Sequence, residues 1–315
     1  MEYVGLRNHG GTGYLNSIFQ QLFMEKEFRE TILNFTFSKQ KEQLNENELV
    51  LYELKNIFHI LAKKQVEFTE TLEFCKVFKD WEGNPINPRA VMDCSEFMSM
   101  LFDKLDSAST GIIKNLFGGT ISHQIVCREG NHINEREESF FSISLDVRGH
   151  TSFLGSFSKF CEAEMLEGEN QYYCVSCGKK VDATKRQIIK KMPKNLIVHL
   201  KRYDFDYNTF QRIKLNSYFE FPLETNLKKF TLQNENQNQN ENLNFTLHGI
   251  IVHKGTVNAG QNYSIINTKE KWIKFDDKKI SEYNTADIDQ DFYGGLDKNN
   301  KEKMQSAYIL FYKKN

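Results

Sequence analysis

The sequence has little of what marks several classes of protein, and each shortage narrows the expected function. Its 315 residues hold only six cysteines, too few for a disulfide scaffold, so we expect a reducing compartment: the cytoplasm, with the nucleus also open. The 41 basic and 42 acidic side chains nearly cancel, so no overall field draws the chain to nucleic acid or to a membrane surface. Apolar runs fall short of the roughly 20 residues that span a bilayer, and we expect neither membrane insertion nor a secretion leader.

What the chain does contain is enough apolar material for a large core, at 39% hydrophobic and 13% aromatic residues. The first third predicts helices, because apolar side chains recur at helical spacing in residues 14–23 and again from Leu51 to Leu61. A third helix is predicted after Pro88, with Phe97 facing inward. These spacings favour a helical N-terminal region.

From about residue 117 the apolar period changes from helical to alternating. Residues 141–147 and 196–200 alternate apolar with polar or charged side chains, which is typical of strands, and strands are expected to continue to Tyr312. Residues 233–242 contain only Gln, Asn and Glu and cannot bury apolar surface, so we predict a disordered insertion near 233–244. The chain as a whole is expected to be α+β.

One segment near the N-terminus has a recognisable sequence motif. Residues 5–17 read Gly-Leu-Arg-Asn-His-Gly-Gly-Thr-Gly-Tyr-Leu-Asn-Ser, which resembles the box that opens ubiquitin-specific protease (peptidase C19) catalytic domains. That family has a cysteine where Gly13 stands, and a thiol in the first turn of a helix is pushed toward thiolate. Asn8 matches the family's oxyanion donor. The alternative interpretation is that the glycines form only a flexible turn.

A second resemblance concerns the general base and the acid that orients it. Residues 247–255 and 259–264 are similar to the family's histidine box, with Gln261 at the position of the base. A carboxamide cannot accept a thiol proton near neutral pH. Residues 271–277 match the box whose first aspartate orients the imidazole, which assigns that task to Asp276. The alternative for Asp276 is an ordinary solvated turn.

Displaced chemistry is the remaining alternative at this site. His9, His248 and His253 lie near the two boxes, and Ser17 lies one helical turn below Gly13. A lone histidine in a sheet is more often a packed core residue than a catalyst, and Ser17 has to reach back by about 5.4 Å. We therefore expect no relocated catalytic pair.

The resemblance runs along nearly the whole chain and is nearest to the fat-facets-like branch of these proteases. It implies a papain-like fold with a helical thumb over residues 1–116, antiparallel β fingers mainly over 117–195, and a mixed palm mainly over 196–315. Because the first box begins almost at Met1, we suspect that the sequence is one domain of a longer protein.

The resemblance also implies where the tail of ubiquitin lies. Tyr14, Asp93 and Tyr203 match family positions near that tail. Two departures weaken the match: Val91-Met92 replaces a glutamine-rich stretch, and Asn262 replaces the aromatic residue after the base. For Asp93 an alternative of equal weight is a structural one: its negative charge is favourable at a helix N-terminus because of the helix dipole.

The family's fingers carry a zinc site, and here it is damaged. Cys174 and Cys177 have the spacing of two zinc ligands, but the matching pair reads Cys127 and Gly130. His132 is the one candidate for a fourth ligand. We expect the three cysteines to pack as small apolar groups without metal, and a structural zinc is the alternative.

Taken together, the substitutions predict a pseudo-deubiquitinase, an inactive protease fold that binds ubiquitin or ubiquitin conjugates or serves as a scaffold for other proteins. The alternative is an active deubiquitinase, of the cysteine type or with a displaced nucleophile. Loss at Gly13 and Gln261 favours the inactive form, because nucleophile and base act as a unit. The further loss at Gly130 suggests natural decay of the family's chemistry.

Overall fold

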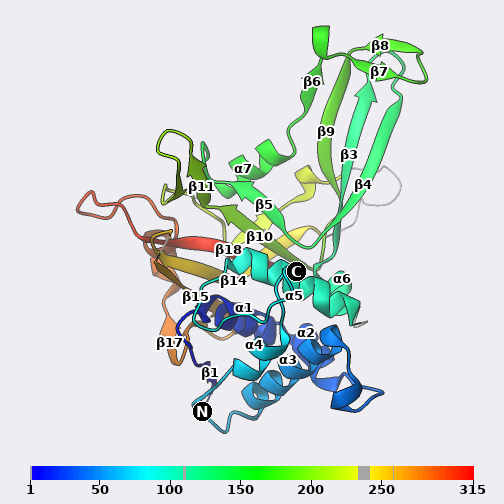
Figure 1. Cartoon of the computed structure of the whole chain (residues 1–315). Helices are drawn as coiled ribbons and strands as arrows, with labels where there is room; N and C mark the ends of the chain where they lie inside the picture. The colour runs from blue at the N-terminus through cyan, green and yellow to red at the C-terminus, as the bar shows by residue number, and fades with distance from the viewer. Residues whose placement is uncertain (1, 109–110, 233–241, 258) are drawn as a thin grey trace.

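The computed structural model describes residues 2–108, 111–232, 242–257 and 259–315, and it has three regions (Figure 1). Helices occupy the N-terminal region, a large twisted sheet lies beside them, and a slender second sheet projects away. The α+β class predicted from the sequence is confirmed. Among the described residues no helix is long and apolar enough to cross a membrane.

The helical region is built where the helical spacing predicted it. Its helices are α1 (Gly13–Met24), α2 (Lys26–Asn34), α3 (Glu46–Lys63), α4 (Leu72–Val77), α5 (Cys94–Ser107) and α6 (Ile112–Phe117), with the 3₁₀ turn η1 (Lys41–Gln43). Asn45 and Glu48 form a capping box that starts α3. Asp93 caps α5 by accepting hydrogen bonds from the backbone N–H groups of Ser95 and Glu96.

The large sheet has the strand order β17-β16-β15-β14-β18-β10-β5, with β13 paired to β14. Its strands are β5 (Ile143–Asp146), β10 (Asn195–Lys201), β13 (Glu224–Asn226), β14 (Asn244–Gly255), β15 (Gly260–Asn267), β16 (Trp272–Asp276), β17 (Lys279–Tyr283) and β18 (Gln305–Lys314). Among the described strands of this sheet, β5 and β10 alone pair in parallel. β5 belongs here because its apolar residues Ile143 and Leu145 are buried in the core of this sheet.

Both faces of the sheet are covered. In β14, Ile251 faces the core shared with the helical region, while Ile250 and Val252 face the opposite core, as strand alternation requires. Helices α7 (Phe153–Phe160) and α8 (Ile288–Phe292), with η4 (Thr285–Asp287) and η3 (Lys228–Phe230), lie on that opposite side. Burial on both faces explains the near-continuous apolar runs of the central strands.

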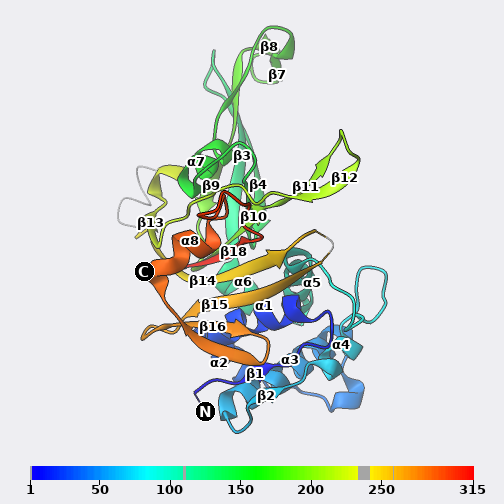
Figure 2. The same ribbon diagram turned by 90° about the vertical axis from the view of Figure 1, so that its left-hand side faces the viewer.

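The projecting sheet has the order β4-β3-β9-β6 and ends in a small hairpin (Figure 2). Its strands are β3 (Gly119–Cys127), β4 (Ile133–Phe140), β6 (Glu164–Leu166) and β9 (Ala183–Lys191), and the hairpin is β7 (Tyr172–Cys174) and β8 (Lys179–Val181), preceded by η2 (Gly168–Asn170). A separate small core of Cys127, Cys174 and Val181 lies at this tip. The tip is therefore held by few apolar contacts of its own.

Two short pairings complete the fold. β1 (Gly5–Leu6) pairs in parallel with β2 (Phe68–Thr69), and β11 (Tyr203–Asp206) forms a hairpin with β12 (Gln211–Lys214) that stands out in Figure 2. Of the predicted insertion, residues 233–241 lie outside the described residues. Of the predicted insertion's last residues, Leu243 is buried and Asn244 begins β14.

Helix α1 joins the helical region to the large sheet. It packs against β15, and the buried amide of Gln21 donates to the carbonyl oxygen of Ile250 at 3.2 Å. Gly249 leaves the room for this amide, because a Cβ there would lie 1.9 Å from Gln21 Oε1. On the other side of α1, Tyr14 packs edge to face on Phe97. These contacts fix Gly13, the first residue of α1, at the edge of a cleft.

Candidate functional site

The cleft between α1 and the large sheet contains two hollows. The smaller has a volume of about 370 Å³ and the larger about 710 Å³, and both are bordered by Val91, Gly260 and Asn262. The smaller is also lined by Asn8, Gly10, Gly11, Gly13, Tyr14 and Gln261. Because they share these three residues, the two hollows adjoin and form one groove. The smaller hollow lies at the start of α1.

Gly13, the position matched to the nucleophile, lines the smaller hollow and has no side chain. A Cβ atom at this position would lie 3.4 Å from both the carbonyl oxygen of Asn262 and Nδ2 of Asn8, which is ordinary contact. Gly11 differs, because a Cβ there would lie 2.6 Å from the backbone carbonyl of Ala90. The cleft thus has space for a side chain at position 13 and none at position 11.

Asn8, the predicted oxyanion donor, is held rigidly beside Gly13. Its Oδ1 accepts from the backbone N–H groups of Gly10 at 2.9 Å and Thr12 at 3.2 Å. Its Nδ2 donates to Oδ2 of Asp277 at 2.9 Å. An amide nitrogen carries two N–H groups, so one remains to donate into the hollow.

Gln261 lies at the position matched to the base, and its hydrogen-bond partner is Asp277, to which the sequence analysis gave no role. Its Nε2 donates to Oδ2 of Asp277 at 3.1 Å. Asp276, to which we assigned the orienting role, pairs with Nζ of Lys274 at 3.1 Å. The reason is local: Asp276 ends β16, whereas Asp277 begins the turn to β17 at φ 55°, so their side chains leave in different directions.

Asp277 is the functional residue that the sequence analysis missed. Its two carboxylate oxygens accept from three side-chain amides, those of Asn8, Asn16 and Gln261, the Asn16 contact being 2.8 Å. The adjacent Asp276–Asp277 pair was the only signal available, and alternation along β16 did not decide between the two. The contacts leave the carboxylate paired to neutral amides rather than to an imidazolium.

Ser17, Cys94 and His253 are poor replacements for the nucleophile and base, each for a physical reason. The hydroxyl of Ser17 is buried and donates to the carbonyl oxygen of Gly13 at 2.7 Å. Cys94 lines the larger hollow, but its thiol is buried against the Tyr14 carbonyl and burial raises its pKa well above the usual value. Burial lowers the pKa of His253 to about 4, and a ring this weakly basic is a poor proton acceptor near neutral pH.

The other two histidines lie outside both hollows. Neither His9 nor His248 borders the cleft among the described lining residues. Burial lowers the pKa of His248 to about 4. The structure therefore brings together Asn8, Gly13 and Gln261 and leaves these histidines apart.

The three residues matched to the tail contacts border the groove. Tyr14 lines the smaller hollow, while Asp93 and Tyr203 line the larger one. Asp93 caps α5 with one carboxylate oxygen and accepts from the Tyr308 hydroxyl at 2.5 Å with the other. The capping alternative for Asp93 is thus confirmed, and a contact to a ligand in the groove stays a prediction.

A half-buried cation, Lys214, supports the hairpin that borders the larger hollow. Nζ of Lys214 donates to the carbonyl oxygens of His253, Gly255 and Met304 at 3.2, 3.1 and 2.9 Å. Burial lowers the pKa of Lys214 to about 8. The ammonium ties the end of β12 to the end of β14, which holds the hairpin of β11 and β12 over the groove.

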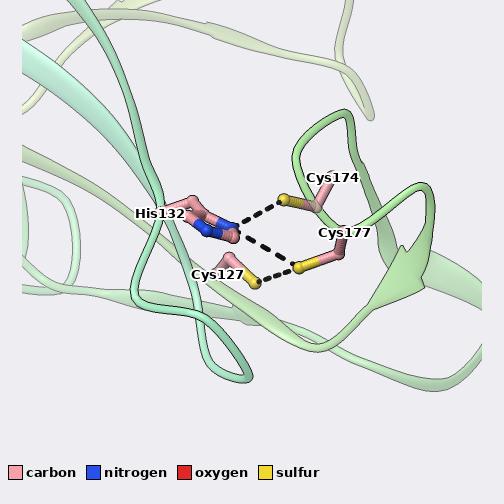
Figure 3. Close-up of side chains that lie close together, drawn as sticks. All are labelled: Cys127, His132, Cys174 and Cys177. Atoms are coloured by element: carbon pink, nitrogen blue, oxygen red, sulfur yellow. Dashed lines mark hydrogen bonds between the residues drawn. The ribbon is translucent and has the colours of Figure 1, made fainter.

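The second chemical cluster lies at the tip of the projecting sheet (Figure 3). Ligating atoms of Cys127, His132, Cys174 and Cys177 all lie within 4.8 Å of one another. The sulfurs of Cys127 and Cys177 are 3.6 Å apart, too far for a disulfide, and His132 Nδ1 lies 3.5 and 3.4 Å from the sulfurs of Cys174 and Cys177. The structure brings His132, which the sequence analysis named as the candidate fourth ligand, together with the three cysteines.

These separations fit a tetrahedral metal site. With Zn–S near 2.3 Å and Zn–N near 2.05 Å, tetrahedral ligands lie about 3.8 Å apart for two sulfurs and about 3.6 Å apart for sulfur and nitrogen. Three of the six separations, at 3.4 to 3.6 Å, are close to these values, and all six are within 4.8 Å. The four residues form a possible metal-binding group of the three-cysteine, one-histidine type.

Comparison with known proteins identifies the family to which the chain is similar. The family profile described as "Ubiquitin carboxyl-terminal hydrolase" matches residues 4–312. The chain is 32% identical over 359 residues to human ubiquitin carboxyl-terminal hydrolase 24, covering 99% of this chain and 14% of that protein. It is 29% identical over 401 residues to mouse ubiquitin carboxyl-terminal hydrolase 9Y, covering 99% and 16%. For ubiquitin carboxyl-terminal hydrolase 15 of Schizosaccharomyces pombe the identity is 31% over 325 residues, covering 98% and 28%. The chain therefore spans less than a third of the length of these relatives.

The difference between Gly13 and Gly11 can be tested by stability. We expect Gly13→Ala to keep or raise the free energy of unfolding by about 0.5–1 kcal/mol, because alanine is the better helix former and the site has room for its Cβ. Gly11→Ala should lower it, because the Cβ meets the backbone at Ala90. Urea unfolding monitored by circular dichroism measures both, and equal effects of the two variants contradict the geometry.

Proposed function

The chain belongs to the ubiquitin carboxyl-terminal hydrolase family, and from this premise we propose that it is a catalytically silent member that binds ubiquitin or ubiquitin conjugates. The observation that carries the proposal is that the cleft has neither a nucleophile nor a general base at the two matched positions. Gly13 has no atom to attack a carbonyl, and Gln261 has no lone pair basic enough to accept a proton. Of the other groove residues, Tyr14, Asp93 and Tyr203 match the family positions, while Val91, Met92 and Asn262 depart from them.

The magnitudes favour silence over slow catalysis. In a serine protease, removing the nucleophile or its base lowers kcat on the order of a million-fold, and the oxyanion donors and binding contacts alone retain only a small rate. Asn8 therefore stabilises nothing without an attacking atom. Cys94 and Ser17 offer no substitute, because both side chains are buried and neither faces Gly13 as a free group.

Binding is supported by what remains of the groove. Its two hollows share a border, and Asp93 and Tyr203 line the larger one. The ring of Tyr203 is fixed edge to face against His253 at 5.4 Å and Tyr308 at 5.3 Å. A preorganised groove of this kind binds an extended chain without ordering its own side chains first.

If ubiquitin does not bind, the same fold serves as a scaffold for other proteins. We propose action in a reducing compartment, the cytoplasm or nucleus, because all six cysteines are free thiols. The competing proposal of an active deubiquitinase needs a displaced nucleophile, and no side chain among the described cleft residues supplies one.

The first experiment measures hydrolysis of a fluorogenic ubiquitin substrate. We expect no turnover above buffer by the unaltered protein, with or without a thiol-alkylating agent. The double variant Gly13→Cys with Gln261→His should regain measurable hydrolysis, because position 13 has room for a side chain and residue 261 already reaches the carboxylate of Asp277.

The single variants are the controls for this experiment. Gly13→Cys alone lacks a base and Gln261→His alone lacks a nucleophile, so each should stay inactive. Alkylation-sensitive turnover by the unaltered protein, or equal rates for a single and the double variant, would overturn the proposal of silence.

The second experiment titrates the protein into ¹⁵N-labelled ubiquitin and follows chemical shifts. We expect shifts that saturate, and we expect Val91→Trp to weaken binding, because Val91 is 67% exposed and borders both hollows. Val66→Trp is the matched control, since Val66 is partly exposed and borders neither hollow. Unchanged ubiquitin spectra at high protein concentration leave only the scaffold role.

A structural zinc at the tip is a further part of the proposal. Cys127, Cys174 and Cys177 would hold it as thiolates and His132 as a neutral imidazole. When bound, the ion would tie the β3–β4 end to the hairpin of β7 and β8, where the apolar core is small.

Metal analysis tests the zinc directly. We expect about one zinc per chain after purification without chelator, and loss of zinc in Cys177→Ser. Cys161→Ser is the matched control, because Cys161 is also partly exposed but lies outside the cluster. Full zinc content in Cys177→Ser, or none in the unaltered protein, contradicts a site of this composition.

A further inference from the structure

We propose that His132 binds the metal through Nδ1 and that residue 130 is glycine because the imidazole of His132 needs its space. This inference rests on the proposed zinc site and goes further. It states that Gly130, which is not itself a metal ligand, determines whether His132 can act as the fourth ligand. The usual spacing for two ligands on one hairpin has two residues between them, as in Cys174 and Cys177. The facing hairpin uses four, from Cys127 to His132.

The turn between β3 and β4 carries His132 back to Cys127. The backbone N–H of Cys127 donates to the carbonyl oxygen of His132 at 2.9 Å, and that of Arg128 donates to Asp182 at 3.0 Å. Asn131 takes a left-handed conformation at φ 53°, which closes the turn. His132 and Cys127 therefore start from neighbouring points of the same hairpin.

Gly130 lies directly under the ring. A Cβ at position 130 would lie 2.5 Å from Cε1 and 2.8 Å from Nδ1 of His132, distances that real Cβ atoms do not show. The φ of Gly130 is not left-handed, so its backbone accepts a side chain without strain. What excludes one is the imidazole in its present place.

The ring atom that faces the sulfurs decides how His132 binds. Nδ1 is the nitrogen that lies 3.5 and 3.4 Å from the sulfurs of Cys174 and Cys177. His132 is exposed while Cys127 and Cys174 are buried, so the imidazole covers the open side of the cluster. Without metal the ring can swing into solvent, but once bound it cannot leave the space beside Gly130 without losing the bond.

The test is a double-mutant cycle on metal affinity, with Co²⁺ as an optical substitute for Zn²⁺. Gly130→Ala should weaken binding by about 10- to 100-fold, the usual loss when a residue that positions a metal ligand is changed. His132→Ala should weaken it at least as much. The combined variant should bind no worse than His132→Ala alone, because the ring that the alanine displaces is already gone.

Two further measurements complete the cycle. His123→Ala is the matched control, since His123 lies on the same sheet and outside the metal group, and it should leave the affinity unchanged. Gly130→Cys with His132→Ala should regain tight binding with a stronger thiolate-to-cobalt absorption, because it places a thiol at the usual spacing. This rescue separates loss of a ligand from loss of folding.

The results that overturn the inference are specific. If His132→Ala keeps the affinity of the unaltered protein, or Gly130→Ala changes nothing, the coupling is wrong while zinc binding itself stands. Resonances of His132 that show metal at Nε2 also contradict it. If the unaltered protein binds neither Co²⁺ nor Zn²⁺, this inference and the zinc proposal fail together, and the ubiquitin experiments are unaffected.

Discussion

The carboxylate of Asp277 connects the two halves of the cleft. It accepts from Asn8 and Asn16, on the helical side, and from Gln261 on the sheet. Hydrogen bonds to a charged group contribute about 1.5–3 kcal/mol each, and an amide left without its partner in a partly buried site is costly. This one acceptor therefore holds the start of α1 against β15 and β16, and every feature of the groove depends on that placement.

For the silent member proposed above, such a frame explains how the cleft keeps its shape. The carboxylate of Asp277 has an amide donor in Gln261 at 3.1 Å, so its charge is not left without a partner. Asp276 has its own partner in Lys274. The contacts that stabilise the cleft are therefore separate from the nucleophile and base on which the proposal of silence rests.

The sequence predicted the helices and strands well where the apolar period was long and regular. α1 follows the spacing of residues 14–23, and β10 follows the alternation of residues 196–200. The period identifies which face of an element is buried but not which distant side chain it meets. The family and the positions of Gly13 and Gln261 were predicted from the resemblance of short segments to the family's boxes. Neither that resemblance nor the apolar period predicted the partner of Gln261.

Two sets of contacts were not accessible from the sequence, for the same reason. The sequence analysis gave Asp277 no role, and the contacts of Asp277 depend on its left-handed conformation at the turn after β16, which local sequence does not reveal. The sequence analysis named His132 as the candidate fourth ligand, but it gave neither the turn that returns His132 to Cys127 nor the closeness of the ring to Gly130. In both cases a turn, rather than a helix or strand, set the geometry.

The central claim is that no atom in the cleft attacks the end of ubiquitin. The most direct measurement is intact-protein mass spectrometry after incubation with ubiquitin that carries a thiol-reactive group at its C-terminus. The account predicts an unchanged mass for this protein and a gain of one ubiquitin when Gly13→Cys and Gln261→His are introduced together. A ubiquitin adduct on the unaltered protein, mapped to a residue that borders either hollow, would contradict it.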